Sequence, residues 1–273
     1  MSWLDREGAS FGQEVWDRID GAARASAAEV VAARKILPVA GPLGISLRAG
    51  ISEDEAVGDE EESSGEAHVH VPSTSALPLL HRPFRLGARS VEAFLSRGEP
   101  LDLDEAEEAA RSVARAEERL LFAGHPRARV PGLLRHRGAL DLPLHDWSDP
   151  RRAADDLLAA LAQLDSMGRH GPYAAAIAPS RYWQLFRPYE GTSLTPHAQL
   201  AALFEGGLVK APALTEGAVV VMKSGSGPRV LVGQELAAAY DGREGIFHRI
   251  SLVESVTLLE GVPGSVAVLG PAR

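Results

Sequence analysis

Apolar residues near the start of the chain recur at helical spacing. Between residues 10 and 34 they repeat at i, i+3, i+4 and i+7, which places them on one stripe of a helix. Ser10 is suited to cap this helix, and Pro38 disfavours helical geometry at Leu37, the residue before it. The pattern predicts one long helix over residues 10–34, followed by a turn at residues 39–44 that contains two glycines and a proline.

Residues 102–123 show the clearest helical pattern. Acidic side chains crowd the N-terminal end, where Asp102 or Asp104 is expected to cap the helix, and Gly124 is expected to end it. The side that faces the core consists mostly of alanine, valine and leucine, and Glu117 lies on that same side. The pattern therefore predicts a long helix that packs closely through small side chains.

A third long helix is predicted from about Pro150 to Met167, with Asp149 as its cap and Pro150 at its first position. Two shorter helices are predicted at residues 180–186 and 196–205. The loop between them is rich in proline, glycine and threonine, which separate helices because proline and glycine interrupt helical hydrogen bonding.

The remaining periodicity is that of β-strands. A strand is predicted at residues 173–178, and residues 68–86 have the alternation expected of the return strand of a long two-stranded excursion. The C-terminal third contains further strand patterns, at residues 208–214, 217–224, 229–236, 247–262 and 265–269. Residues 225–227, Gly-Ser-Gly, lie between two of them and predict a hairpin turn. Taken together, the elements predict an α+β fold.

The net charge of the chain argues against one class of partner, nucleic acids. Its 273 residues contain 28 Lys and Arg against 37 Asp and Glu, which gives a formal net charge of −9. Binding of phosphate groups requires clustered basic side chains, so we expect no nucleic-acid partner. The chain has no cysteine, which excludes disulfides, thiolate metal sites and a cysteine nucleophile and fits a reducing cytoplasm.

Neither a signal peptide nor a membrane span is expected. The N-terminal residues carry charges throughout and lack the apolar segment of a signal peptide. No apolar run reaches the roughly 18 residues of a membrane-spanning helix. We therefore predict a soluble, cytoplasmic protein without a membrane partner.

Two polar features invite a functional interpretation. Residues 52–66 form a dense acidic run, which is typical of a solvated or disordered loop, although a surface that attracts metal ions or repels a partner molecule is the alternative. His68 and His70 share one face of a predicted strand at a spacing that can chelate a metal. Because an exposed strand shows the same alternation, we favour that interpretation and assign no metal site.

No motif marks a catalytic centre. Serine, histidine and aspartate are abundant, but no G-x-S-x-G turn singles out one serine as a nucleophile. Residues 224–228 resemble a phosphate-binding loop only superficially, because they lack its lysine and precede a strand pattern. We therefore assign no catalytic residue and no cofactor, and we expect binding or assembly as the function.

Several short motifs follow one another in a fixed order. The first predicted helix contains Trp16 and ends in a basic segment at Arg34 and Lys35, and a Gly-Pro-Leu-Gly turn follows at residues 41–44. Further motifs lie at residues 77–80, 82–84, 116–124, 132–134, 171–173, 232–236 and 239–240. This series resembles the encapsulin shell-protein family, also called linocin-like bacteriocins, over roughly residues 10–270.

The resemblance implies the fold of tailed-bacteriophage major capsid proteins, which has a peripheral domain, an axial domain and an extended loop. By this resemblance, residues 1–44 form an N-terminal helix and arm on the luminal side, and residues 45–80 form the extended loop. The axial domain comprises residues 138–222. The peripheral domain, with its spine helix, comprises residues 81–137 and 223–273.

The resemblance also implies a structural function. Family members assemble into a closed icosahedral shell of sixty copies or a multiple, an encapsulin nanocompartment in the cytoplasm, and enclose a cargo protein that carries a C-terminal targeting peptide. Residues 142–147 and 185–191 look like those of members with iron-storing cargo, so a ferritin-like protein is the expected cargo and a peroxidase is the alternative. A viral major capsid protein of the same fold and a peptide hydrolase remain as other function classes.

Two sets of site residues are carried over from the family. The cargo-peptide residues are Val30, Val31, Arg34, Leu37, Glu235, Leu236, Ala238, Ala239 and Tyr240. The loop that lines the five-fold pore comprises Arg187, Pro188, Tyr189, Glu190, Gly191, Thr192 and Ser193. The sequence departs from the family at Pro38, where many members carry an acidic residue that would pair with basic ends of the cargo peptide.

Overall fold

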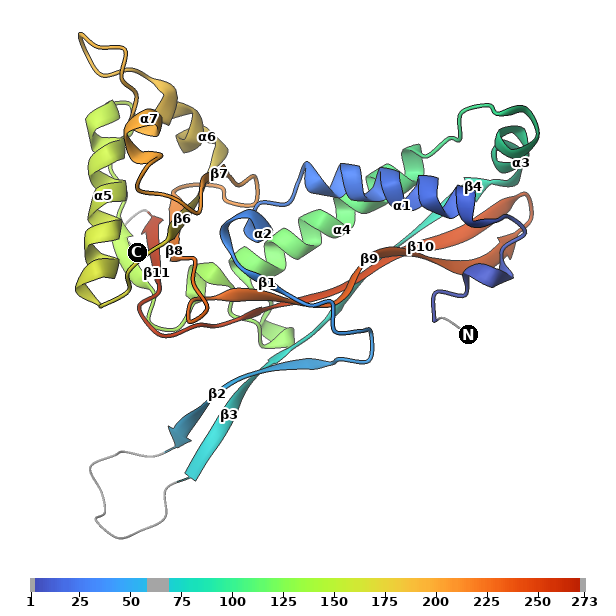
Figure 1. Cartoon of the computed structure of the whole chain (residues 1–273), viewed down its shortest axis with the longest axis horizontal. Helices are drawn as coiled ribbons and strands as arrows, with labels where there is room; N and C mark the ends of the chain where they lie inside the picture. Colours follow the sequence, from blue (N-terminus) through green and yellow to red (C-terminus); the bar gives the residue numbers. More distant parts are fainter. Residues whose placement is uncertain (1–2, 58–68, 271–273) are drawn as a thin grey trace.

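The structure is a computed structural model that describes residues 3–57 and 69–270, and of residues 52–57 and 69–72 it describes only the backbone. An elongated body has a more compact part at one end, and a two-stranded hairpin projects from its lower edge (Figure 1). The described strands form a four-stranded sheet of order β1-β9-β10-β4, a five-stranded sheet of order β5-β11-β8-β6-β7 and the pair β2-β3. This combination of helices and separate sheets confirms the predicted α+β class.

The four-stranded sheet forms the floor of the elongated body. Its strands are β1 (Val39–Ala40), β9 (Arg229–Glu244), β10 (Phe247–Leu259) and β4 (Leu79–Gly87). β10 pairs antiparallel with both β9 and β4, and β1 pairs parallel with β9. Two helices, α1 (Gln13–Ala28) and α4 (Asp104–Ala123), cover one face of this sheet. Short elements at the far end are η1 (Arg6–Gly8) and α3 (Ala88–Arg97).

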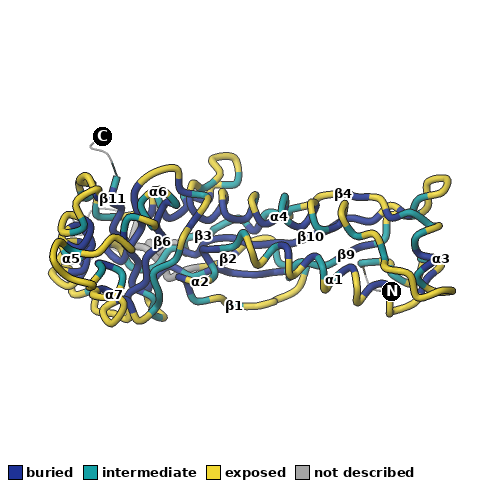
Figure 2. Tube along the Cα trace, turned by 90° about the horizontal axis from the view of Figure 1, so that it is seen from above, coloured by how far each residue is buried: buried dark blue, intermediate teal, exposed yellow. Residues whose placement is uncertain are grey.

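An apolar layer joins the two helices to the sheet. Trp16 and Ile19 from α1 and Ala110 from α4 are buried together with Ile250 of β10. Figure 2 shows buried residues running along the length of the body, with exposed residues at its outer turns. Burial of apolar surface along this layer is the main contribution that holds helices and sheet together.

The predicted helix over residues 10–34 is wrong in its length. α1 begins after Gly12, not after Ser10, and it ends at Ala28; a separate short helix, α2 (Ala33–Ile36), follows. The physical reason is a contact distant in sequence: Glu118 Oε1 accepts hydrogen bonds from the backbone N–H groups of Ala32 and Ala33, at 2.9 Å each. These amides begin α2 and are bonded to a side chain of α4 instead of to the preceding turn of one continuous helix.

α4 agrees with its prediction apart from its first two residues and its cap, because Leu103 occupies the N-cap position and no side chain caps the helix. Asp102 lies before the helix and accepts a hydrogen bond from the amide of Asp104 at 3.3 Å. Gly124 ends the helix in the left-handed region, with φ of +76°. Residues that follow form the short turns η2 (Pro126–Ala128) and η3 (Leu133–Arg135).

The five-stranded sheet lies in the compact end of the molecule. Its strands are β5 (Leu140–Pro143), β11 (Val266–Gly270), β8 (Ala218–Met222), β6 (Tyr173–Ile177) and β7 (Leu208–Lys210). α5 (Pro150–Ser166) packs on it, and the predicted cap is confirmed because the Asp149 side chain accepts a hydrogen bond from the Arg151 amide. The strand predictions for residues 173–178 and for the C-terminal third are confirmed by β6 to β11.

Of the two helices that flank the loop at residues 187–195, only the second is shorter than predicted. Residues 180–186 form α6 (Pro179–Tyr182) and a 3₁₀ turn, η4 (Trp183–Phe186). α7 (Pro196–Leu200) stops well before residue 205. The chain leaves the helix because the amide of Gly206 bonds the carbonyl of Tyr173 at 2.8 Å, which draws the following residues onto the sheet as β7.

The predicted hairpin at residues 225–227 is wrong. β8 belongs to the five-stranded sheet and β9 to the four-stranded sheet, so this segment crosses between the two sheets. It runs beside the segment that joins β10 to β11, where the amide of Val262 bonds the carbonyl of Ser226 at 2.9 Å. Glycine is required here, because a Cβ at Gly227 would lie 2.1 Å from the carbonyl oxygen of Met222.

Residues 68–86 also differ from their prediction as one return strand. They contain two strands in different sheets: β3 (Val69–Ala76) pairs with β2 (Ala49–Val57), whereas β4 pairs with β10. Residues 58–68, which include much of the acidic run and His68, lie outside the described residues, as does the side chain of His70. The interpretations of the acidic run and of the histidine pair therefore stay predictions.

Two further expectations concern a membrane span and a metal site. Among the helices of the described residues, none is long and apolar enough to cross a membrane. Within the same part of the chain, no group of three or more His, Asp or Glu side chains is arranged to hold a metal ion.

Candidate binding pocket

A cavity of about 260 Å³ opens where α1 ends and the chain turns into α2. Its walls come from four elements that are far apart in sequence: the end of α1 with the connection to α2, α2 itself, α4 and the paired strands β9 and β10. The lining residues are Arg24, Ala27, Ala28, Val31, Arg34, Lys35, Glu117, Glu235, Leu236 and Glu254. The pocket thus combines a small apolar wall with a charged floor.

Arg34 stands at the centre of the charged floor. Its Nε donates a hydrogen bond to Glu117 Oε1 at 2.6 Å, and its Nη1 donates to Glu235 Oε2 at 2.9 Å. Its Nη2 donates to Glu254 Oε1. One guanidinium therefore bridges carboxylates from α4, β9 and β10, and it fixes α2 against both layers of the body.

The charges on this floor do not balance. The side chains of Glu117 and Glu254 are only 2% and 4% exposed, whereas that of Glu235 is 47% exposed. With all three carboxylates ionised, the cluster around Arg34 carries a net charge of −2. Burial is costly for such groups unless they are paired, so this excess is expressed as shifted pKa values.

The pKa shifts follow from burial and from the short distances. Burial raises the pKa of Glu117, and burial together with the neighbouring Glu117 carboxylate raises the pKa of Glu254 to about 8. Burial opposes the charge of Arg34, but Glu117 and Glu254 outweigh it and raise the pKa of its guanidinium. Arg34 is therefore permanently charged, and the pocket holds a proton on its carboxylates near neutral pH.

Glu118 of α4 holds the start of α2, and thereby positions the pocket, although it does not line the cavity. It is 1% exposed, and burial raises its pKa to about 7 although two backbone amides donate to its Oε1. Its Oε2 has no hydrogen-bond partner among the described residues. Because its partners are the first amides of α2, Glu118 determines where Arg34 is held without lining the pocket itself.

The apolar wall is built from small and branched side chains. Ala27, Ala28 and Val31 come from the end of α1 and the connection to α2, and Leu236 faces them from β9. Arg24 and Lys35 lie at the rim and are exposed. An extended peptide with spaced aliphatic side chains fits such a groove, because apolar pockets select side chains while polar groups fix the register.

The structure brings four of the nine predicted cargo-peptide residues together around the cavity: Val31, Arg34, Glu235 and Leu236. Val30 adjoins the cavity in sequence but does not line it, and Leu37 is buried in the core between the two sheets. Ala238 and Ala239 are buried in the four-stranded sheet. Tyr240 packs against the rings of Phe11 and Trp16 at the far end of α1.

The sequence interpretation missed several lining residues, and two of them carried a signal. Glu117 is a charged residue within the apolar side of a helix, and Glu254 interrupts an apolar strand pattern. A carboxylate at a core position requires a buried cation, and this requirement was the available clue. Arg24, Ala27 and Ala28 carried no comparable signal, because exposed helix ends are commonly of this composition.

The predicted pore loop lies far from this pocket, at the tip of the compact end (Figure 1). Residues 187–193 join η4 to the loop that precedes α7, and most of them are exposed. The amide of Tyr189 bonds the carbonyl of Leu194 at 2.9 Å, and the Tyr189 hydroxyl lies 2.5 Å from Gln199 Oε1. These bonds close the loop on itself, so its tip is held in one shape.

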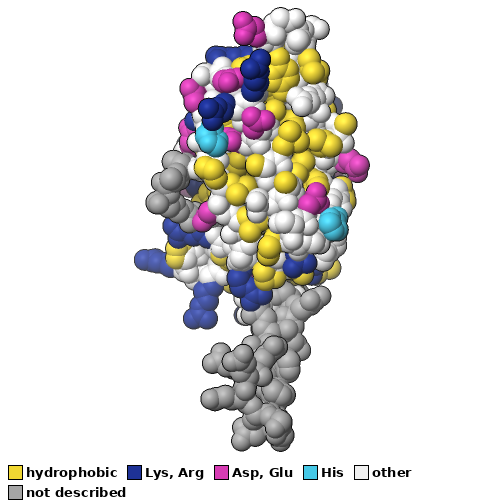
Figure 3. Space-filling view, turned by 90° about the vertical axis from the view of Figure 1, so that its left-hand side faces the viewer, with side chains coloured by type: hydrophobic (Ala, Val, Ile, Leu, Met, Phe, Trp, Pro, Cys, Tyr) yellow, Lys and Arg dark blue, Asp and Glu magenta, His cyan; other side chains and the backbone are white. Residues whose placement is uncertain are grey.

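Exposed aromatic side chains gather next to this loop. Trp183 is 59% exposed and Phe186 is 43% exposed, and the Phe186 ring stacks on His197 with 4.5 Å between centroids. Lys210 Nζ lies 4.9 Å from the centre of the Trp183 ring. We call Tyr182, Trp183, Phe186 and His197 the aromatic patch. Figure 3 views this end of the molecule and shows hydrophobic side chains spread over its middle.

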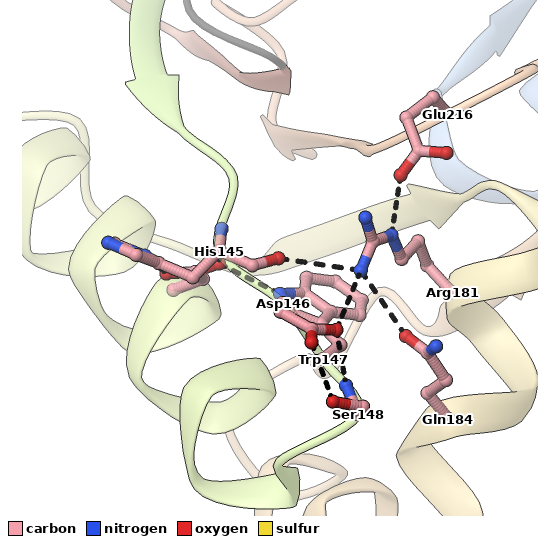
Figure 4. Close-up of polar contacts among 8 residues, drawn as sticks. His145, Asp146, Trp147, Ser148, Arg181, Gln184 and Glu216 are labelled. Atoms are coloured by element: carbon pink, nitrogen blue, oxygen red, sulfur yellow. Dashed lines mark hydrogen bonds and ion pairs between the residues drawn. The ribbon is translucent and has the colours of Figure 1, made fainter.

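A polar network joins α5 to α6, the helix that ends at Tyr182 of the aromatic patch (Figure 4). Asp156 of α5 is buried, and it accepts hydrogen bonds from the Trp147 indole at 2.8 Å and from the amide of His145 at 2.9 Å. Arg181 of α6 donates to Glu216 at 2.5 Å and to the carbonyl of His145 at 3.4 Å. The network therefore ties α5, α6 and the segment before β8 into one unit.

Neither His145 nor His81, each of which lies near a serine, has the geometry of a hydrolase. His145 Nδ1 lies 2.5 Å from Asp156 Oδ1, but the hydroxyl of nearby Ser148 donates to Asp146 at 2.7 Å instead of to the imidazole (Figure 4). His81 Nε2 does lie 2.8 Å from the hydroxyl of buried Ser251.

The Ser251 arrangement is also not that of a nucleophile. Its hydroxyl donates its proton to Asp241, so His81 is the donor to Ser251 and not its base. A serine nucleophile must instead donate to the histidine that deprotonates it. The geometry at both histidines therefore offers the peptide-hydrolase interpretation no support.

Comparison with known proteins places the chain among shell proteins. The family model described as "Encapsulating protein for peroxidase" matches residues 1–257. A type 1 encapsulin shell protein of Rhodospirillum rubrum is 30% identical over 263 residues, which cover 94% of this chain and 92% of the relative.

Solved structures give the same result for the fold. A virus-like particle from Pyrococcus furiosus superposes with a TM-score of 0.74 at 23% identity, covering 94% of this chain and 100% of that one. The capsid of Myoviridae Phage XM1 superposes with a TM-score of 0.60 at 12% identity, covering 87% and 90%. These similarities confirm the predicted capsid fold.

Proposed function

The chain belongs to the encapsulin shell-protein family, and from this premise we propose that it is the protomer of a closed icosahedral shell of sixty copies or a multiple. Its relatives are named as shell proteins, so its role is structural and not enzymatic, as predicted. Within the shell we propose the division inferred from the family: an N-terminal helix and arm at residues 1–44, an extended loop at 45–80, an axial domain at 138–222 and a peripheral domain from the rest. The proposed location is the cytoplasm.

The aromatic patch is the observation that best supports the proposed assembly. A protomer that worked alone would gain by burying Trp183 and Phe186, which are more than 40% exposed at one end of the molecule. Exposed apolar groups of this size mark protein–protein contacts. The patch adjoins residues 187–193, which we propose to line the five-fold pore, so its occupant is the neighbouring protomer around that axis.

The β2–β3 hairpin supports the same proposal. It stands away from the body as a two-stranded sheet, and an isolated pair of strands is marginally stable in water (Figure 1). Contact with a second protomer would supply the packing that it lacks.

We propose that the pocket around Arg34 binds the C-terminal targeting peptide of the cargo. Support comes from the apolar wall, which suits aliphatic side chains, and from the charged groups of the floor, which can bond the peptide backbone, although Pro38 supplies no carboxylate. The cargo is a ferritin-like or a peroxidase protein. The family description names peroxidase and favours that alternative over the ferritin-like cargo expected from the sequence.

Electron microscopy of the purified protein tests the assembly. Uniform closed particles are expected, and a monodisperse monomer would contradict the proposal. Nuclease-protected DNA inside the particles would instead support a viral capsid protein.

A pair of neighbouring valines tests the pocket. Val31 lines the cavity and Val30 does not, although both are partly exposed. Val31→Asp is expected to reduce loading of a fluorescent protein that carries the tail of the cargo by at least about tenfold, because a charge replaces an apolar contact. Val30→Asp is the matched control and is expected to load normally. Equal loading of both variants would show that the pocket does not bind the cargo peptide.

A further inference from the structure

The segment after α4 concentrates positive charge in an acidic chain. Residues 125–137 contain four arginines, two histidines and no acidic residue. Glu260 meets this segment from elsewhere in the fold, but there its Oε1 accepts a hydrogen bond from the backbone amide of Arg137, at 2.9 Å. The segment is therefore a local source of positive potential.

A second cavity, of about 280 Å³, lies within this segment. Its walls are the end of α4 at Ala123 and residues 125–135, and we call it the arginine pocket. Three of its lining side chains are polar, those of His125, Arg129 and Arg135, and the others are those of alanine, valine and proline. The lining thus contains no acidic side chain, no hydroxyl and no side-chain amide.

The turn that carries these side chains is closed by its own backbone. The amide of His125 bonds the carbonyl of Val130 at 2.7 Å, and the amide of Val130 bonds the carbonyl of His125 at 3.3 Å. The two ends of the turn touch, because a Cβ at Gly132 would lie 2.3 Å from the Gly124 nitrogen. The polar side chains of the arginine pocket are therefore mounted on a rigid support.

Arg129 is held in an unfavourable backbone conformation. Its φ is +52°, in the left-handed region that favours glycine. Strain of this kind is found most often at ligand-binding and active sites, where the side chain is needed in one place. The position keeps an arginine although glycine would adopt the same φ without strain.

The hydrogen bonds of the turn also fix the proton of His125. The amide of Ala128 donates to His125 Nδ1 at 3.2 Å. A ring nitrogen that accepts a hydrogen bond carries no proton, so the proton of the neutral imidazole is on Nε2. His125 is exposed, and it therefore offers an N–H donor at the arginine pocket.

Arg129 and Arg135 have no acidic partner in the part of the chain that the structure describes. Both are exposed, and no described carboxylate lies within ion-pair distance of either guanidinium group. Arg115 of α4, by contrast, is paired with Glu108 at 2.6 Å. The arginine pocket therefore presents donors and positive charge that the described chain does not satisfy.

This donor set selects the chemistry of a ligand. Each guanidinium can donate two parallel hydrogen bonds to a phosphate, and such charge-assisted bonds are stronger than neutral ones. A phosphate group offers acceptor oxygens in several directions, which suits donors that come from separate positions of a turn. The cavity is also several times larger than the roughly 30 Å³ of a water molecule, so a group of this size has room.

We propose that the arginine pocket binds a small multivalent phosphate anion, one per protomer, through His125, Arg129 and Arg135. No residue lines both this cavity and the pocket around Arg34, so the anion and the cargo peptide have separate sites. The lining has no aromatic ring on which a nucleic-acid base could stack. The phosphate group itself is therefore what is recognised.

Isothermal titration of the intact protein with pyrophosphate tests the site. One saturable site per chain is expected at low salt, and it should weaken when NaCl is added, because exposed charges are screened. The double variant Arg129→Gln, Arg135→Gln is expected to bind at least about tenfold more weakly, because charge-assisted bonds are lost.

Arg119→Gln, Arg152→Gln is the matched control. Both residues are exposed arginines, and neither lines the arginine pocket. This variant is expected to bind pyrophosphate as the unaltered protein does. Equal affinity of the two double variants, or heat that never saturates, would overturn the proposal.

Arg129→Gly separates binding from the integrity of the turn. Glycine adopts the φ of +52° without strain, so the thermal unfolding midpoint should not fall. Pyrophosphate should nevertheless bind several-fold more weakly, because one guanidinium is missing. Unweakened binding by Arg129→Gly would remove Arg129 from the site and overturn the assignment.

Two further outcomes concern the ligand class and the proposed function. A single-stranded oligonucleotide that binds tenfold more tightly than pyrophosphate, and only with the pocket arginines present, would overturn the small-anion assignment in favour of nucleic acid. Protein that forms no closed particles but binds pyrophosphate overturns the proposed function and leaves this site standing. Closed particles of unaltered protein that bind no pyrophosphate do the reverse.

Discussion

Single residues with charge in apolar surroundings organise the candidate binding pocket. Arg34 is one cation among three carboxylates, and each carboxylate comes from a different element. The helical pattern placed Glu117 correctly on the core side of its helix, and Glu254, which the strand pattern did not single out, is buried as well. Their partner was not predictable, because Arg34 is separated from Glu254 by 220 residues and only the packed sheet brings them together.

Glu118 allows a prediction about pH at the residue scale. Its pKa is raised from 4.5 to about 7 in the folded protein, mainly by burial. Between these values the unfolded chain loses its proton first, so folding is progressively disfavoured as the pH rises from about 4.5 to 7. The loss is on the order of 3 kcal/mol at full effect.

Glu118→Gln is expected to remove this part of the pH dependence, because a neutral amide still accepts hydrogen bonds from Ala32 and Ala33 without losing a proton. Thermal unfolding midpoints of assembled protein between pH 5 and pH 8 provide the measurement. Glu108→Gln, an exposed site on the same helix, should leave the decline caused by Glu118 in place. A smaller decline should remain in Glu118→Gln, because burial also raises the pKa values of Glu117 and Glu254. A decline of unchanged size would contradict the assignment to Glu118.

At the scale of elements, local sequence signals were reliable where the structure depends on residues that are neighbours in the sequence. Asp149 and Pro150 start α5 as predicted, because a cap and a first-turn proline act through neighbouring backbone groups. The break between α1 and α2 escaped prediction because it depends on Glu118, which is 85 residues from Ala33. The glycines at residues 225–227 predicted a sharp turn but not which sheet would receive the next strand.

Gly124 allows a second prediction, about the end of α4. Its φ of +76° disfavours any side chain, and a Cβ would lie 2.3 Å from the carbonyl oxygens of Val130 and Pro131. Gly124→Ala combines left-handed strain of about 1–2 kcal/mol with a backbone clash. A clear fall in the thermal unfolding midpoint is therefore expected.

Gly168, which follows α5, serves as the comparison. It has a similar φ of +69°, but nothing lies within 4 Å of the position of its Cβ. Gly168→Ala should therefore show only the strain and a smaller fall. If the two variants lost equal stability, the close approach of the backbone at Gly124 would be of no consequence.

At the scale of the whole molecule, the ordered series of motifs was more informative than any one of them. Residues 171–173 and 232–236 lie in different sheets, and each motif alone is compatible with many folds. Their order over most of the chain indicated the capsid fold, which the structural similarities confirm. Composition could not do this, because an acidic, cysteine-free α+β chain fits many functions. The aromatic patch was also not predicted, since exposure depends on tertiary packing.

Trp183 tests whether this exposure serves assembly. Trp183→Ser removes an indole that is 59% exposed, so the fold of the protomer should be retained while the contact with a neighbour is lost. The expected result is a smaller fraction of particles in analytical ultracentrifugation, with an unchanged circular dichroism spectrum. Trp183→Phe keeps an aromatic ring and should assemble nearly normally. Normal particles from Trp183→Ser would show that the patch lies outside the contacts between protomers, and the five-fold interface would have to be sought on another face.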